Sequence, residues 1–149
     1  MNTIVVGYDG SDAAKRALQR AAELAEAFGA KLTVVSVTEP IPIAGEPLVP
    51  GDAVGMGTVG APAVPDTEES NRELEEAKRS LASRSIETEY VSTVGDAADA
   101  IVDAAESRSA DMIVVGSRHP GFLDRLLAGD VGEAVSRRTR RDVLIVHEG

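Results

Sequence analysis

Cysteine is absent from the 149-residue sequence, and histidine occurs only twice, at His119 and His147. Without cysteine, the protein has no disulfides, no thiolate metal site and no cysteine nucleophile. Two histidines are too few for a typical histidine-based metal centre. Long apolar runs are also missing, since none reaches the roughly 18 residues that a membrane span requires. Met1-Asn2-Thr3 leads directly into strand-like sequence and not into a signal peptide. We therefore expect a soluble, cytoplasmic protein that does not bind membranes.

Lysine is scarce: only three of the 15 basic residues are lysines, against 25 aspartates and glutamates. The net charge of −10 disfavours attraction of nucleic acid or anionic lipid to the surface as a whole. An acidic, lysine-poor surface suits a cell with high internal salt, where screening weakens self-repulsion, so a halophilic source is one interpretation. Positive charge gathers only between Arg118 and Arg141, where six arginines accompany three acidic residues. Four of them follow the last expected helix, where they would complement the helix dipole and not bind nucleic acid.

Strand-like and helix-like segments alternate along the chain. Short apolar or alternating runs predict strands, whereas residues such as Ala14, Leu18 and Ala21 recur at helical spacing. Strands are expected at residues 3–8, 31–37, 86–91, 111–115 and 142–146, and helices at 14–28, at 66–83, from 97 and from 131. Residues 40–65 contain six of the seven prolines and five glycines, which predicts a loop.

This alternation of strands and helices is typical of right-handed crossovers and a parallel sheet between two layers of helices. We therefore expect an α/β fold, a three-layer α/β/α sandwich whose five-stranded parallel sheet has the order 3-2-1-4-5. No repeat and no second domain are evident, so residues 1–149 are interpreted as a single domain with a variable loop at about 40–65. The glutamate-rich helix at 66–83 is interpreted as a solvated surface.

Ligands of such sheets bind outside the carboxyl ends of the strands, and two strand ends are rich in glycine. The first is residues 7–11 (GYDGS), and the second is residues 116–121 (GSRHPG), continuing to 129–131 (GDV). Neither is a Walker A loop or a dinucleotide fingerprint. Their glycines nevertheless flank a helix N-terminus, where backbone N–H groups can hold an anion.

The sequence resembles the universal stress protein family over essentially its whole length, apart from the loop at 40–65. The resemblance is carried by Asp9-Gly10-Ser11 after the first strand, by Gly95-Asp96-Ala97, and most strongly by residues 114–146 (VVGSRHPGFLDRLLAGDVGEAVSRRTRRDVLIV). It implies a cytoplasmic regulatory role in the stress response without a defined reaction, so we do not expect an enzyme; slow ATP hydrolysis is the one activity considered.

Nucleotide-binding members of this family carry a glycine, two residues, a glycine, nine residues, and then a glycine followed by serine or threonine. Gly116 and Gly129 match the first and third glycines, whereas His119 replaces the second and Asp130 replaces the serine or threonine. Asp130 places a carboxylate where phosphates would bind, and Pro120 restricts His119 to extended geometry. We therefore predict that ATP binds weakly or not at all and that no cofactor is held.

The alternative is a sensor that binds ATP or AMP, with Mg²⁺ softening the charge of Asp130. The candidate nucleotide crevice then consists of Gly7, Tyr8, Asp9, Val37, Gly116, Ser117, Arg118, His119, Gly129, Asp130 and Val131. Two roles remain open for Asp9, which contacts a nucleotide or forms an Asx-turn before the first helix. Arg118 either holds phosphate or is solvated. No nucleophile motif accompanies His119, which argues against a catalytic base.

The last strand would lie at an edge of a sheet of order 3-2-1-4-5. Its residues Val143, Leu144, Ile145 and Val146 are apolar without interruption, and no proline or lysine protects them. Such an edge recruits another strand, which predicts a homodimer through this segment. The alternative is that the run is apolar only because helices cover both sides of a parallel strand. An additional protein partner, of unknown identity, is expected for a protein that acts by interaction.

Overall fold

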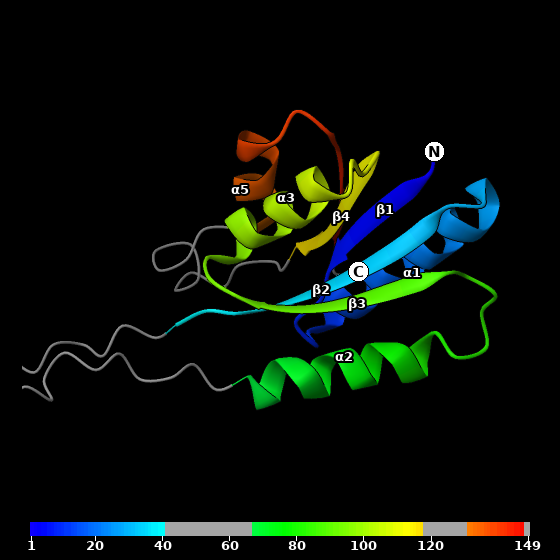
Figure 1. Ribbon diagram of the computed structural model, residues 1–149, viewed down its shortest axis with the longest axis horizontal. Coiled ribbons are helices and arrows are strands. Elements are labelled where there is room, and N and C mark those ends of the chain that lie inside the picture. Colours follow the sequence, from blue (N-terminus) through cyan, green and yellow to red (C-terminus); the bar gives the residue numbers. More distant parts are fainter. Residues whose placement is uncertain (41–66, 118–130, 148–149) are drawn as a thin grey trace, which may run out of the picture.

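A computed structural model describes residues 1–40, 67–117 and 131–147 of the chain. Its centre is a five-stranded parallel sheet (Figure 1), and the strand order β3-β2-β1-β4-β5 confirms the predicted topology. The strands are β1 (Thr3–Gly7), β2 (Lys31–Thr38), β3 (Thr88–Val94), β4 (Met112–Ser117) and β5 (Asp142–His147).

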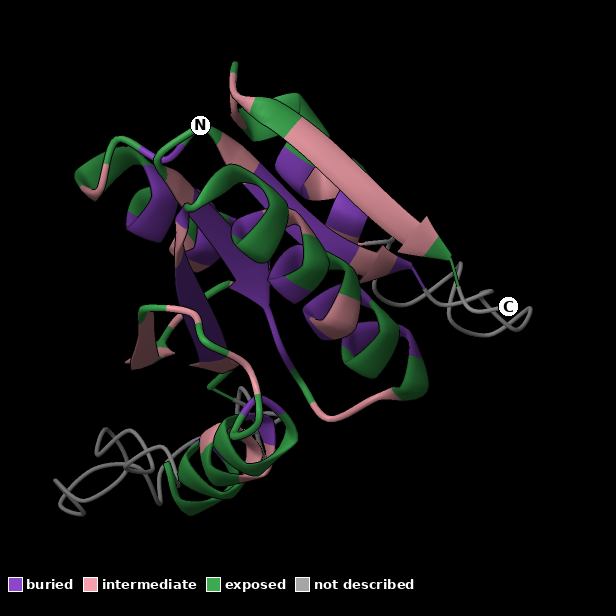
Figure 2. Cartoon of the chain, turned by 90° about the vertical axis from the view of Figure 1, so that its right-hand side faces the viewer, coloured by how far each residue is buried: buried purple, intermediate pink, exposed green. Residues whose placement is uncertain are grey.

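Helices cover both sides of this sheet, which confirms the three-layer sandwich. The helices are α1 (Asp12–Phe28), α2 (Glu68–Ser80), α3 (Ala97–Ser107) and α5 (Val131–Arg138). One apolar core joins α1 and α2 to the sheet, and a second core joins α3 and α5 to its other side. In Figure 2 the central strands are buried, whereas the outer sides of the helices are exposed.

Alternation along the strands builds these two cores, because successive side chains point to opposite sides of a sheet. Ile4 and Val6 pack toward α1 and α2, whereas Val5 packs toward α3, and all three are completely buried. Burial on both sides explains why β1 is a continuous apolar run.

Local signals determine where the helices begin and end. The Ser11 hydroxyl accepts from the Ala14 N–H (3.1 Å) and caps α1, and Gly29 ends that helix in the left-handed conformation at φ 63°. Asp96 caps α3 by accepting from the Asp99 N–H (3.0 Å). The expected loop at 40–65 lies outside the described residues except for residue 40.

The third strand differs from its expected range of 86–91. Its pairing with β2 runs from Leu32↔Thr88 to Thr38↔Val94, so the length of β2 extends β3 beyond the apolar alternation. Ile86 precedes the strand and packs against the core below α1 and α2. The apolar pattern therefore marked positions that are partly buried, such as Ile86 and Tyr90, but not the ends of the strand.

The last strand lies at the edge of the sheet, as the predicted order requires. Val143, Leu144, Ile145 and Val146 are each half-buried and pack partly against the core on either side of the sheet. Among the described residues, β5 pairs only with β4. The structure thus has both the open edge and the partial cover by helices that the sequence left as alternatives.

Candidate functional site

The candidate crevice lies at the carboxyl ends of β1, β2 and β4, next to the start of α5. The described residues predicted for it all lie at this edge: Gly7, Tyr8, Asp9, Val37, Gly116, Ser117 and Val131. Strand pairing brings them together, since Val6 is in register with Val114 and the Tyr8 N–H donates to the Val35 carbonyl (2.9 Å). The other predicted residues, Arg118, His119, Gly129 and Asp130, lie outside the described residues.

Gly116, the first glycine of the family pattern, is required by packing. A Cβ at this position would lie 2.5 Å from the carbonyl carbon of Ala13 and 2.8 Å from the Ala14 nitrogen. Both are backbone atoms of the first turn of α1, so β4 approaches this helix too closely for a side chain. Gly132 is also tightly packed, because its Cβ would lie 3.2 Å from the Val115 side chain. Neither glycine needs a phosphate to explain it.

Asp9 adopts the Asx-turn that the sequence offered as one of its two roles. Its Oδ1 accepts from the Ser11 N–H (2.9 Å), just before α1 begins. This contact ties the carboxylate to the backbone just before α1. The turn accounts for an aspartate at this position without a ligand.

Tyr8 belongs to the core below α1 and α2. Its side chain is 3% exposed, and its hydroxyl donates to Glu76 Oε1 on α2 (2.8 Å). Burial and the neighbouring Glu76 carboxylate raise the pKa of the Tyr8 hydroxyl well above its usual range. The side chain therefore links β1 to α2 and is not a free donor for a ligand.

Helix α2 is attached to the sheet by polar contacts that the sequence analysis missed. The hydroxyl of the fully buried Ser36 donates to Glu73 Oε2 (2.5 Å), and Ser70, also buried, shares a hydrogen bond with Ser92 of β3 (2.8 Å). The interpretation of this helix as a solvated surface is wrong for these positions. The signal was present as spacing, because Ser70, Glu73 and Ala77 recur every three or four residues and share one side of the helix.

Glu73 carries an electrostatic cost in this position. Burial raises the pKa of its carboxyl above the usual value, and the negative charges of Asp9, Glu69 and Glu76 act in the same direction. The hydrogen bond from Ser36 opposes this rise. Because the folded-state pKa is raised, the ionised group disfavours folding at neutral pH, and the cost disappears as pH falls through that pKa.

Glu73→Gln is expected to raise the free energy of unfolding by about 0.5 kcal/mol near pH 7, because solvent screening limits the effect of a half-exposed charge. The amide oxygen can still accept from Ser36, while the repulsion from the nearby carboxylates is removed. Urea unfolding at pH 7 and at a lower pH measures the difference, which should shrink as the pH falls, because the raised pKa of Glu73 favours its protonation in the folded wild type. Glu75→Gln, at an exposed position on the same helix, is the control and should change little. Equal destabilisation by Glu73→Gln at both pH values would contradict this account.

The arginines that end α5 pair with carboxylates. Arg137 contacts Glu133 (2.8 Å), Arg138 contacts Asp96 at the start of α3 (2.8 Å), and Arg141 contacts Glu106 (3.0 Å). The Arg141 hydrogen bond also holds the pKa of Glu106 below its usual value. Arg138 and Arg141 therefore connect α5 and the start of β5 to α3 and its N-cap, whereas the Arg137 pair lies within α5.

Two further features can be assessed over residues 1–40, 67–117 and 131–147. Within these ranges, no three histidine, aspartate or glutamate side chains gather as a metal site would require. No helix there combines the length and the apolar character needed to cross a membrane.

Comparison with known proteins agrees with this architecture. The family model described as "Universal stress protein family" matches residues 1–147. The chain is 31% identical to the stress response protein NhaX of Bacillus subtilis, covering 96% of each chain. It is 34% identical to the universal stress protein Rv1636 of Mycobacterium tuberculosis, covering 97% of this chain and 95% of the other. A crystal structure of a universal stress protein in complex with cAMP superposes with a TM-score of 0.72 at 33% identity, covering 99% of this chain and 98% of that one. The chain belongs to the universal stress protein family.

Proposed function

We propose that this member of the stress-response family is a cytoplasmic homodimer that acts by binding a protein partner, and that its crevice binds ATP weakly or not at all. It is then not an enzyme, and its acidic surface suits a high-salt cytoplasm. The family and its link to the stress response are established by the comparisons. The mode of action proposed here goes beyond them.

The start of α5 carries this proposal. The helix begins at Val131, and the residue before it in the sequence is Asp130. A helix N-terminus is where backbone N–H groups bind phosphate, and an aspartate next to it satisfies the same groups with its own carboxylate. An aspartate at this place in the sequence therefore disfavours a bound phosphate, because the two negative charges repel each other.

Packing around the crevice supports the same conclusion. Gly116 lies against the backbone of α1, Asp9 accepts from Ser11, and Tyr8 donates to Glu76. The polar groups described near the crevice thus have partners within the chain, which suits a protein that does not depend on a nucleotide for its structure.

The second candidate is an adenine-nucleotide sensor with slow or no hydrolysis. It is favoured by the related structure that holds cAMP, and by the position of Gly7, Val37 and Val131 around the crevice. ATP or AMP would be the ligand, and Mg²⁺ would supply positive charge between the phosphates and Asp130.

Titration calorimetry of the purified protein with ATP, with and without Mg²⁺, separates the two candidates. The proposal predicts no saturable binding at micromolar ATP, and no adenine absorbance in the solution released by denaturing the protein. Micromolar affinity, or nucleotide carried through purification, would overturn the proposal in favour of the sensor.

The homodimer is tested at β5. Its outer edge is unpaired among the described residues, and Val143–Val146 are half-buried, so a two-fold pairing of the same strand closes the edge. Light scattering after gel filtration should give the mass of a dimer. Ile145→Pro, which removes a backbone donor at the centre of the strand, should give a folded monomer.

The matched control is Val94→Pro, which introduces proline at the opposite edge of the sheet and should leave the dimer intact. Circular dichroism of both variants shows whether they fold. A wild-type monomer, or a folded Ile145→Pro variant that remains dimeric, would exclude β5 as the interface.

A further inference from the structure

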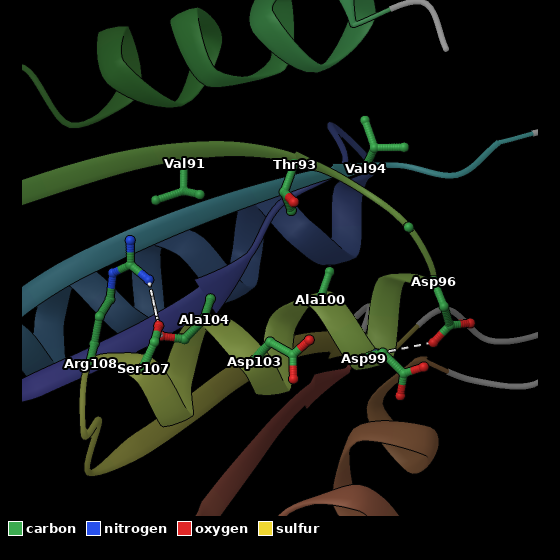
Figure 3. A pocket seen from close by; sticks show the side chains of 11 residues that line it. Val91, Thr93, Val94, Asp96, Asp99, Ala100, Asp103, Ala104, Ser107 and Arg108 are labelled. Atoms are coloured by element: carbon green, nitrogen blue, oxygen red, sulfur yellow. Dashed lines mark hydrogen bonds between the residues drawn. The ribbon is translucent and has the colours of Figure 1, made fainter. Parts of the chain in front are cut away.

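A groove of about 370 Å³ lies between the edge strand β3 and helix α3. In Figure 3, Val91 and Thr93 point from β3 toward α3, and Arg108 extends into the space between the two elements. Ala100 and Ala104 of α3 line the groove with small apolar side chains. These side chains form an apolar surface beside the edge strand β3.

The outer edge of β3 offers unpaired backbone groups. Among the described residues β3 pairs only with β2. The Leu32 N–H donates to the Glu87 carbonyl (2.9 Å), and the Gly95 N–H donates to the Thr38 carbonyl (3.0 Å). Since backbone groups of a strand alternate in direction, the odd-numbered residues from 87 to 95 point to β2, and Val94 presents its N–H and C=O outward.

Neither lysine nor proline, two residues that commonly protect an edge strand from pairing with another strand, occurs in β3, which reads TEYVSTV. Val94 is 44% exposed. The strand is therefore a template onto which an extended segment can add.

The charge of the groove specifies what kind of segment fits. Asp96, Asp99 and Asp103 lie along α3 and line the groove together. Arg138 pairs with Asp96 (2.8 Å) and Asp99 (3.3 Å), and Arg108 pairs with Glu89 (2.7 Å). The carboxylates of Glu89 and the three aspartates thus outnumber the guanidinium groups of Arg108 and Arg138 by four to two. Within the described part of the chain no cation pairs with Asp103, which is exposed.

We propose that this groove docks an extended, basic segment of a protein partner, added as a strand along the outer edge of β3. Side chains two residues apart on a strand are separated by about 6.6 Å. Asp99 and Asp103, four residues apart on α3, are separated by about 6 Å along the helix axis, and α3 runs beside β3 in Figure 3. Lysine or arginine at alternate positions therefore matches the acidic side of the groove, while the backbone pairs with β3.

A second copy of the chain fits this surface poorly. Pairing two β3 edges would bring together the aspartates of both grooves on molecules that each carry a net charge of −10. This inference rests on that part of the proposed function which assigns a protein partner to the chain. It does not depend on whether the crevice binds nucleotide.

Fluorescence anisotropy with labelled peptides of about ten residues tests the docking. The probe alternates threonine and lysine. One control has the same composition with its lysines in a single block, and the other is the alternating peptide methylated on every second backbone nitrogen. At physiological salt we expect saturable binding of the probe and an affinity at least about tenfold lower for either control. Equal binding of the three peptides would overturn the proposal, since it would show attraction by charge alone.

Variants of the protein locate the site. Asp103→Lys should weaken binding of the probe by about tenfold or more, whereas Glu75→Lys, the same charge change on α2, should weaken it less than about threefold. Val94→Pro removes an outward donor and should also weaken it. Equal losses for Asp103→Lys and Glu75→Lys would place binding elsewhere. ATP titrations of these variants should match the wild type, so a failure here and a failure of the crevice proposal are distinguishable.

Discussion

Replacing Gly116 with alanine is expected to lower the free energy of unfolding by about 3 kcal/mol, the upper part of the usual range for overpacked positions. The added Cβ would lie 2.5 Å from the Ala13 carbonyl carbon and 2.6 Å from its oxygen. These atoms belong to the first turn of α1, which cannot move without disturbing the Ser11 cap and the buried side of the helix. Thermal unfolding should show a fall in the melting temperature of about 6 to 12 °C.

Gly7→Ala is the matched control, because Gly7 ends the neighbouring strand β1. Its Cβ would lie 2.7 Å from Ile101 Cδ1, which is the end of a side chain and can change rotamer. A loss of only about 1 kcal/mol is expected there. If both variants were equally destabilised, the close approach of α1 to β4 would not be the reason for glycine at position 116.

The fold could be predicted because its signals are local and repeated. Apolar runs such as residues 3–8 are long enough to mark a buried parallel strand, and the turn residues Ser11, Gly29 and Asp96 mark where helices start or stop. The alternation of strands and helices is then compatible with only a few sheet topologies. The ends of β3 were less predictable, since pairing with β2 decides them and this pairing is not a local property.

The polar contacts of the site could be predicted only in part. The Asx-turn of Asp9 follows from neighbouring residues and was one of the expected alternatives. The contacts of Tyr8 with Glu76 and of Ser36 with Glu73 join residues that are 68 and 37 positions apart. Only the tertiary packing of α2 on β2 and β3 brings such pairs together, whereas a glutamate-rich helix by itself indicates a solvent-exposed surface.

Charge patterns posed a similar difficulty. Asp96, Asp99 and Asp103 are visible in the sequence as an acidic side of one helix. Their position beside an edge strand emerges only in the folded structure, where β3 ends the sheet and α3 lies next to it. The three aspartates indicate a basic partner only because the edge strand β3 lies beside them.

The double substitution Asp130→Ser with His119→Gly is expected to raise the affinity for ATP by up to about three decades. The family pattern has glycine at the position of His119 and serine or threonine at that of Asp130. One pair of like charges about 4 Å apart, at an effective dielectric constant near 20, costs roughly 4 kcal/mol, which corresponds to about three decades in the dissociation constant. Serine, like aspartate, is a preferred residue at a helix N-cap, so we expect the gain without a loss of the fold.

Titration calorimetry of the wild type, both single variants and the double variant measures this effect. Asp130→Ser should account for most of the gain, because it removes the charge, and His119→Gly should add to it by opening the turn. Asp142→Ser is the control, because this substitution changes the net charge by the same amount. Asp142 is the first residue of β5, so it lies at the end of the sheet away from the carboxyl ends of the strands. The gain with Asp130→Ser should also shrink at high salt, where the repulsion is screened. A gain of the same size with Asp142→Ser would show that the overall charge of the protein limits ATP binding. If no variant gained affinity, the carboxylate at position 130 would not be what limits ATP binding.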